Sequence, residues 1–288
     1  MQNLRSALQK YLKGQLSTSG ATFSRFAYAM PLAIAYVCAL VAFADYSLPE
    51  PGAKFLAYAA IGGLAQITAT ALLVYIFAFK NFTVGTTFSK TETAQAAVFG
   101  LVVLGETVSP GAMVGIAVSL VGVVLISVTR VSLAPRDMLR QCLELPALVG
   151  LASGAFFGVS AVAYRAASLS LPDGDFIIRA ALTLAVATTF QTLVMAVYMR
   201  IREPGQIGMV VKTWRVSSLV GLTGMLGSVG WLTAMTLQNA AYVRALGQIE
   251  LLFTFAASYL FFKERASRNE LVGIAFVSAG ILLLILIR

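Results

Sequence analysis

The sequence is dominated by long apolar runs separated by short polar connections. Each run holds about 20 residues, the length that an α-helix needs to cross a hydrocarbon layer of about 30 Å. Of the 288 residues, 59% are hydrophobic and 11% charged, a composition that excludes a soluble fold. We therefore predict an all-α integral membrane protein with nine full spans, at roughly 19–44, 54–79, 83–105, 109–129, 146–169, 174–199, 216–237, 241–262 and 270–287.

Several function classes are excluded by the available side chains. The chain has no histidine, which rules out imidazole proton relays and histidine-ligated metals. Cys38 and Cys142 have neither disulfide nor metal-ligand spacing. No phosphate-binding loop of the type GxxxxGK[ST] occurs, so transport driven by ATP would need a partner protein. We expect no metal, no cofactor and no enzymatic activity.

An internal repeat links the two halves of the chain. A shift of 158 residues aligns residues 81–126 with residues 239–284 without a gap. Apolar helices aligned by chance would match leucines and valines, whereas this alignment matches polar residues and glycines, so we infer a duplication. The matched pairs are Asn81 with Asn239, Glu92 with Glu250, Glu106 with Glu264, Ser109 with Ser267, Gly115 with Gly273 and Gly122 with Gly280.

The duplication predicts two repeats of five helices. In the second half, a further span ending in VAYRAAS precedes the span that carries Arg179. By analogy, RSALQKYL near the start corresponds to the end of a first helix whose N-terminal part is absent, since this segment is too short and too charged to cross alone. The first repeat would cover 1–129, with a truncated helix 1 and then helices 2 to 5. A connecting loop would cover 130–145, and the second repeat, helices 6 to 10, would cover 146–288.

Basic residues in the connections predict the topology. Fourteen of them fall on one side of the membrane, including Arg136 and Arg202, and only Lys54 and Arg288 fall on the other. The basic side should be cytoplasmic, and the connections at Asp45 and Asp173 should lie outside. The net charge of +9 is then a topology signal and does not indicate nucleic-acid binding. Because five helices is an odd number, the two repeats should have opposite orientations.

The chain resembles the ten-helix carriers of the drug/metabolite transporter superfamily, which are built from two EamA repeats. The resemblance rests on GETVSPGAMVGIAVSLVGVVLI and KERASRNELVGIAFVSAGILLL, a glutamate at a helix end followed by a last helix that contains glycine. It implies alternating access through a cavity between the halves and a small metabolite, an amino acid or a toxic compound as substrate, often exported. The motif says almost nothing about which substrate is carried.

Polar residues in the middle of the spans are the candidate site. Glu92 lies about nine residues into its span, near the membrane midplane, and Glu250 lies equally deep. An ionised side chain there costs about 3 kcal/mol, so it has to face protein or water. Lys90 and Glu92 are two residues apart and would point to opposite faces of a continuous helix. The candidate substrate- or proton-binding residues are Glu92, Glu250, Lys90, Gln248, Arg25, Arg179 and Gln95.

Two interpretations of these residues stay open. In one, buried ion pairs such as Lys90 with Glu250 hold the halves in register. In the other, a midplane carboxylate binds a cationic group or exchanges a proton, as in transporter sites at repeat interfaces. Arg25 and Arg179 either reach the membrane surface or face the cavity, whereas Arg165 and Arg244 lie nearer span ends and are expected to reach the surface.

The remaining motifs favour structural roles. Ser109 followed by Pro110, and Ser267 three residues before Glu270, are typical of helix starts, so Glu106 and Glu264 should take part in capping. Glycines recur at helical spacing and should allow close helix packing. They are Gly150, Gly154 and Gly158 in one span, and Gly221, Gly224, Gly227 and Gly230 in another.

The leading functional hypothesis is a secondary active transporter of a small polar metabolite in the plasma membrane, here a bacterial inner membrane, with proton coupling left open. The alternatives are a lipid-carrier or nucleotide-sugar translocase on the same fold and, from another class, an integral membrane enzyme. The expected partners are the lipid bilayer, a small-molecule substrate and, under proton coupling, protons. A homodimer stays open, and nucleic acid is not expected.

Overall fold

The protein is described by a computed structural model covering residues 2–79, 82–129, 144–253 and 268–286. All regular structure in these residues is helical. Five helices are long and apolar enough to cross a membrane: α2 (Thr18–Phe43), α3 (Ala53–Ile76), α8 (Leu145–Leu169), α9 (Phe176–Arg202) and α11 (Trp214–Leu237). Two further apolar stretches, Pro110–Ile126 and Leu271–Leu286, are shorter. The all-α membrane fold is therefore confirmed.

The chain divides into two compact units that do not coincide with the two sequence repeats. Unit 1 contains residues 1–77 and 160–238, and unit 2 contains residues 78–159 and 239–288. Each unit therefore combines a segment of the first half of the chain with a segment of the second half. The helix α8 begins in unit 2 and ends in unit 1.

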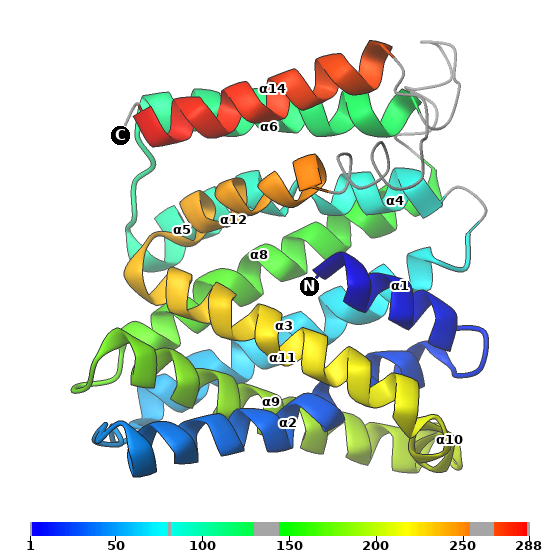
Figure 1. Ribbon diagram of the computed structural model, residues 1–288, viewed down its shortest axis with the longest axis vertical. Coiled ribbons are helices and arrows are strands. Elements are labelled where there is room, and N and C mark those ends of the chain that lie inside the picture. The colour runs from blue at the N-terminus through cyan, green and yellow to red at the C-terminus, as the bar shows by residue number, and fades with distance from the viewer. Residues whose placement is uncertain (1, 80–81, 130–143, 254–267, 287–288) are drawn as a thin grey trace. The chain divides into compact units, whose positions relative to one another are not determined.

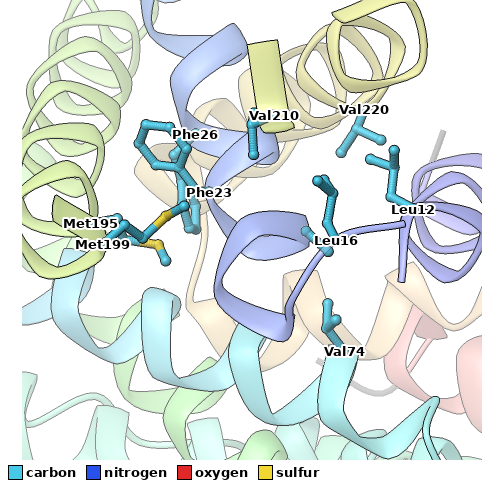
Figure 2. Packing of buried hydrophobic residues seen from close by; sticks show 10 residues of the cluster. Leu12, Leu16, Phe23, Phe26, Val74, Met195, Met199, Val210 and Val220 are labelled. Carbon is cyan, nitrogen blue, oxygen red and sulfur yellow. The ribbon is translucent and has the colours of Figure 1, made fainter. Parts of the chain in front are cut away.

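Unit 1 is built around α2, α3, α9 and α11, with the short helices α1 (Gln2–Leu12) and α10 (Gln206–Lys212) (Figure 1). The helix α2 begins where the Ser17 hydroxyl accepts a hydrogen bond from Gly20 N at 3.0 Å, and α9 begins where Asp175 accepts one from Ile177 N at 3.0 Å. These caps satisfy amide groups that a helix start leaves without partners. The side chains of one core cluster are drawn in Figure 2: Leu12, Leu16, Phe23, Phe26, Val74, Met195, Met199, Val210 and Val220.

Unit 2 contains α4 (Phe82–Ser89), α5 (Glu92–Leu104), α6 (Pro110–Thr129), α12 (Ala240–Gly247), α14 (Arg268–Leu286) and the first part of α8. Ser109 caps α6 as predicted, because its hydroxyl accepts a hydrogen bond from Ala112 N at 3.2 Å. The helix α5 ends at Gly105, whose φ of 66° is a backbone conformation that suits glycine. The predicted cap at Ser267 and Glu264 lies outside the described residues.

The packing of α6 against α14 is consistent with inverted repeats. The two helices lie side by side in Figure 1 and correspond to each other in the sequence repeat. A Cβ atom on Gly115 would come within 2.8 Å of the Gly280 carbonyl oxygen, and one on Gly122 within 2.5 Å of the Gly273 oxygen. The order of these contacts is reversed along the two helices, so they run antiparallel. Glycines at the four positions allow their backbones to touch.

Candidate functional site

The span predicted over 83–105 is interrupted in its middle. The helix α4 ends at Ser89, Lys90 and Thr91 form a turn, and α5 begins at Glu92. In the second repeat, α12 ends at Gly247 and is followed by a turn at Gln248. The shift of 158 residues maps Phe82–Ser89 onto Ala240–Gly247, so the two helices end at matched positions.

The backbone has the same local geometry at both breaks. The amide of Lys90 donates to the Thr87 carbonyl at 2.9 Å, and the amide of Gln248 donates to the Ala245 carbonyl at 3.1 Å. Both are tight, three-residue bonds of the kind that closes a helix. Interrupted helices at corresponding positions of inverted repeats are a feature of transporter binding sites, where the break places backbone groups and side chains at mid-membrane.

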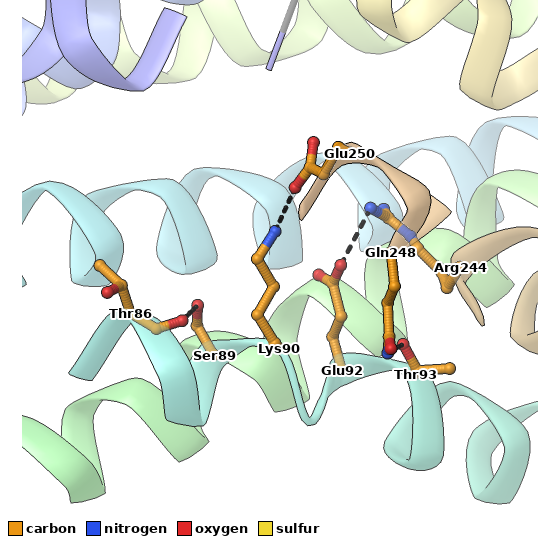
Figure 3. A network of polar contacts seen from close by, with 8 residues as sticks. All are labelled: Thr86, Ser89, Lys90, Glu92, Thr93, Arg244, Gln248 and Glu250. Atoms are coloured by element: carbon orange, nitrogen blue, oxygen red, sulfur yellow. Dashed lines mark hydrogen bonds and ion pairs between the residues drawn. The ribbon is translucent and has the colours of Figure 1, made fainter. Parts of the chain in front are cut away.

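The candidate residues of unit 2 meet at these breaks and form ion pairs across the repeats (Figure 3). The Lys90 ammonium contacts the Glu250 carboxylate. Glu92 Oε1 lies 3.4 Å from Arg244 Nη1. Each glutamate therefore faces a cation of the other repeat, and the charges of these four side chains sum to zero.

Neutral amides extend the same cluster. Gln248 Nε2 donates to Thr93 Oγ1 at 3.2 Å, which joins α5 to the break after α12. Gln95 Nε2 donates to Thr91 Oγ1 at 2.9 Å and approaches the Leu151 carbonyl of α8 at 3.5 Å. Side chains on both sides of the two breaks are thus tied together within unit 2.

The two ion pairs differ in exposure. The side chains of Lys90 and Glu250 are 26% and 20% exposed, whereas those of Arg244 and Glu92 are only 8% and 12% exposed. A buried pair holds its geometry and is costly to break, whereas a partly exposed pair can exchange one partner for a ligand. The Lys90–Glu250 pair is therefore the more accessible half of the cluster.

Two expectations about this region were wrong. Lys90 and Glu92 were expected on opposite faces of one helix, but the turn between them directs both side chains toward the second repeat (Figure 3). Arg244 was expected to reach the membrane surface, but it is buried and pairs with Glu92. The reason is the same in both cases: the helix ends near the cation, Lys90 or Arg244, and a carboxylate from the other repeat contacts it there.

Glycines of α8 pack against α4, the helix that precedes the break at Lys90 and Thr91. A Cβ atom on Gly150 would lie 2.2 Å from the Gly85 carbonyl oxygen, and one on Gly154 would lie 2.9 Å from the Ser89 oxygen. The backbones of α8 and α4 are therefore in direct contact, which confirms the predicted packing role of this series. In the α11 series, Gly221 packs tightly against Tyr28, whereas a Cβ on Gly227 would meet no atom within 4 Å.

Arg25 and Arg179 lie in unit 1 and have different environments. Arg25 is 5% exposed, its Nη1 donates to Thr70 Oγ1 at 2.8 Å, and its guanidinium lies 5.3 Å from the centre of the Phe26 ring. Arg179 Nε donates to the Asp173 carbonyl at 3.3 Å, at the start of α9. Arg25 and Arg179 occupy matching positions in the sequence but make different contacts. The Arg179 side chain reaches toward the connection that precedes α9.

A second polar network in unit 1 was missed by the sequence analysis. Gln191 is completely buried, and its Nε2 lies within hydrogen-bonding distance of Gln66 Oε1 at 2.9 Å and of the Tyr164 hydroxyl at 3.1 Å. Gly62 provides the space for the Tyr164 ring, since a Cβ there would lie 2.7 Å from it. Two glutamines in the middle of predicted spans were the signal that would have located this network. It joins α3, α8 and α9.

Comparison with known proteins identifies the family. The sequence profile of the EamA-like transporter family matches the chain twice, over residues 6–128 and 145–286. The chain belongs to the EamA-like transporter family. A solved structure described only as "Crystal structure of protein" matches 98% of this chain and 95% of its own, with a TM-score of 0.65 and 16% identity, and at that identity it shows the fold alone. None of the curated proteins searched matches the chain.

The EamA-like assignment confirms the resemblance read from the sequence and makes the chain a multi-pass membrane protein of a small-molecule transporter family. Each profile match contains one of the interrupted helices and one of the paired glutamates. The cluster at the breaks is thus built from equivalent parts of the two EamA repeats.

Proposed function

We propose that this EamA-like protein is a secondary active transporter that moves a small polar metabolite, such as an amino acid or a related compound, across the plasma membrane by alternating access. The observation that supports this function best is the pair of helix breaks at matched positions, with charged side chains from both repeats meeting there. Charged side chains are common on protein surfaces that face water. In the middle of apolar spans they are rare, and they are retained where they serve a substrate or ion path.

Lys90 and Glu250 are the proposed substrate- or proton-binding pair. They are the more exposed of the two cross-repeat pairs, and each can exchange its partner for a group on a ligand. A substrate that carries both an ammonium and a carboxylate would offer a charged group to each of them, whereas a singly charged ligand would offer one to only one of them. Glu92 and Arg244 then form a buried ion pair that positions the two broken helices.

Transport by site variants tests this assignment. Glu250→Gln keeps the size and one acceptor oxygen but removes the charge, and because the side chain is partly exposed the variant should fold. We expect its uptake or efflux of labelled metabolites in proteoliposomes to fall at least tenfold. Glu50→Gln, which removes an exposed carboxylate in a connection, is the matched control and should transport normally. A folded Glu250→Gln protein with unchanged transport at acid and neutral pH would contradict the proposal.

The same vesicles separate the alternatives. A lipid-carrier translocase on this fold would move labelled lipid between leaflets and leave metabolite flux at background. A nucleotide-sugar translocase would exchange labelled nucleotide sugar, and a membrane enzyme would change the labelled compound chemically without net flux. If transport is outward, inverted vesicles should accumulate the substrate.

A further inference from the structure

Unit 1 carries a groove that the transport site does not use. The groove has a volume of about 420 Å³ and is walled by three helices that each meet the length and composition of a membrane span. Its walls are the first turn of α2, the second half of α3 and the second half of α9. Its lining includes Ser19, Ile67, Ala71, Tyr75, Val194 and Tyr198.

The groove lies along α3 and α9, next to the level at which these two helices touch. A Cβ atom on Gly63 would lie 2.8 Å from the Phe190 ring, and Gln191 Nε2 donates to the Gly63 carbonyl at 3.2 Å. From Ile67 to Tyr75 the groove follows eight residues of α3, or about 12 Å at 1.5 Å per residue. That length is close to half of a hydrocarbon layer of about 30 Å. The groove therefore has the dimensions of one leaflet.

Its chemistry changes along its length. The middle is lined by aliphatic side chains, which offer water too few hydrogen bonds to be filled by it. At the end of α9 the groove reaches Tyr198, which is 48% exposed, and at the end of α3 it reaches Tyr75, which is 42% exposed. Tyrosines with an apolar ring and a polar hydroxyl are typical of the membrane surface. The aliphatic part thus lies at hydrocarbon depth and the tyrosine end at headgroup depth.

Two charges of opposite sign lie at the tyrosine end. Arg202 follows Tyr198 by four residues on α9, so it continues the face that Val194 and Tyr198 present to the groove, one turn farther along. Its side chain is exposed. The Glu203 carboxylate accepts a hydrogen bond from the hydroxyl of Ser19, a lining residue, at 2.8 Å. A phosphate would be attracted to the first charge and an ammonium to the second.

We infer that this groove binds an aminophospholipid, with one acyl chain between α3 and α9, its phosphate at Arg202 and its ammonium toward Glu203. The acyl chain of the lipid fills the groove and gives the lining side chains dispersion contacts that an empty groove would not provide. The paired charges favour a headgroup that carries both signs, such as phosphatidylethanolamine, over a purely anionic one. The site is separate from the ion pairs of unit 2, so it stands whether or not the proposed transport function does.

Lipid binding to the full-length protein in detergent tests the inference. Native mass spectrometry and thermal shift would compare phosphatidylethanolamine, phosphatidylglycerol and diacylglycerol with identical acyl chains. We expect phosphatidylethanolamine to bind at least tenfold more tightly than diacylglycerol and more tightly than phosphatidylglycerol. Arg202→Gln should weaken its binding about tenfold. Arg200→Gln, two residues away and on the opposite face of α9, is the matched control and should leave binding within about twofold.

A second variant tests the groove itself. Ala71→Phe fills the space at its centre and should abolish retention of the lipid, whereas Val197→Phe enlarges an exposed apolar side chain of α9 outside the lining and should not. Equal affinity for the three lipids, or an Arg202→Gln protein that binds phosphatidylethanolamine as tightly as the original chain, would overturn the inference. So would a dimer that dissociates on Ala71→Phe, because the occupant would then be a second copy of the chain. If Ala71→Phe is not monodisperse, the exposed Arg202 variant decides alone.

Discussion

The buried Glu92–Arg244 pair allows a quantitative test of how the two repeats are held together. Glu92→Gln removes one charge and takes the Glu92 carboxylate away from the Arg244 side chain, which is 8% exposed. Arg244→Met takes the Arg244 guanidinium away from the Glu92 carboxylate. The double variant removes both charges and keeps comparable side-chain volume. These three proteins and the original chain form a double-mutant cycle.

The distance between the two charges sets the expected loss of stability when one of them is removed. At 3.4 Å and an effective dielectric constant of about 20, two unit charges attract by about 5 kcal/mol. Because desolvation opposes this attraction, removal of one partner from a buried pair typically costs about 3–5 kcal/mol, and removal of both is often close to neutral. We therefore expect each single variant to lose about 3–5 kcal/mol and the double variant to recover most of that loss. The more exposed Lys90–Glu250 pair should show a clearly smaller coupling.

Thermal unfolding in detergent, read by tryptophan fluorescence, provides the assay. A loss of about 3–5 kcal/mol lowers the melting temperature of a chain of this size by roughly 6–20 °C. The interaction energy is the difference between the loss in the double variant and the sum of the single losses. Single variants that melt like the original protein, or a double variant whose loss is the sum of the two single losses, would refute the argument that these side chains act as a pair.

Two further predictions concern topology and helix contact. In a cysteine-free background, single cysteines at Asp45 and Asp173 should react with an impermeant reagent in intact cells, and one at Arg202 should react only after permeabilisation; the reverse pattern would contradict the charge argument. Gly150→Ala should lower the yield of monodisperse protein sharply, because the new Cβ would lie 2.2 Å from a backbone oxygen of α4, whereas Gly227→Ala, where no atom lies within 4 Å, should not. Equal yields would argue against the backbone contact between α8 and α4.

The sequence predicted those features that depend on pattern and periodicity. Runs of apolar residues predicted the membrane helices, and the shift of 158 residues predicted the equivalence of α6 with α14 and of Glu92 with Glu250. The pairing of Lys90 with Glu250 was one of the two open interpretations, and the structure contains that contact. These features follow from residue type and spacing alone.

The helix breaks could not be predicted because the turn at Lys90 and Thr91 contains no glycine or proline, and only the single Gly247 precedes the turn at Gln248. Lys90, Thr91 and Gln248 are compatible with an uninterrupted helix, so their turns depend on what the surrounding residues offer. A helix that stops beside Glu250 and Glu92 gains two ion pairs that a continuous helix would direct elsewhere. For the same reason the role of Arg244 was not visible: its repeat mate is Thr86, and only the folded chain brings it to a carboxylate.

The order of synthesis gives the charge cluster a further consequence for folding. Lys90 and Glu92 occur in one short segment, and a charged side chain at the centre of a span costs about 2.5–3.5 kcal/mol on insertion scales. Their partners, Glu250 and Arg244, are more than a hundred residues later in the chain, so pairing cannot offset this cost when the first segment enters the membrane. The apolar helices α3 and α6, which flank this segment in the sequence, have to retain it until the second repeat has been made. We therefore expect the cross-repeat pairs to form late in folding, and the break between α4 and α5 to take its final form only when both repeats are present.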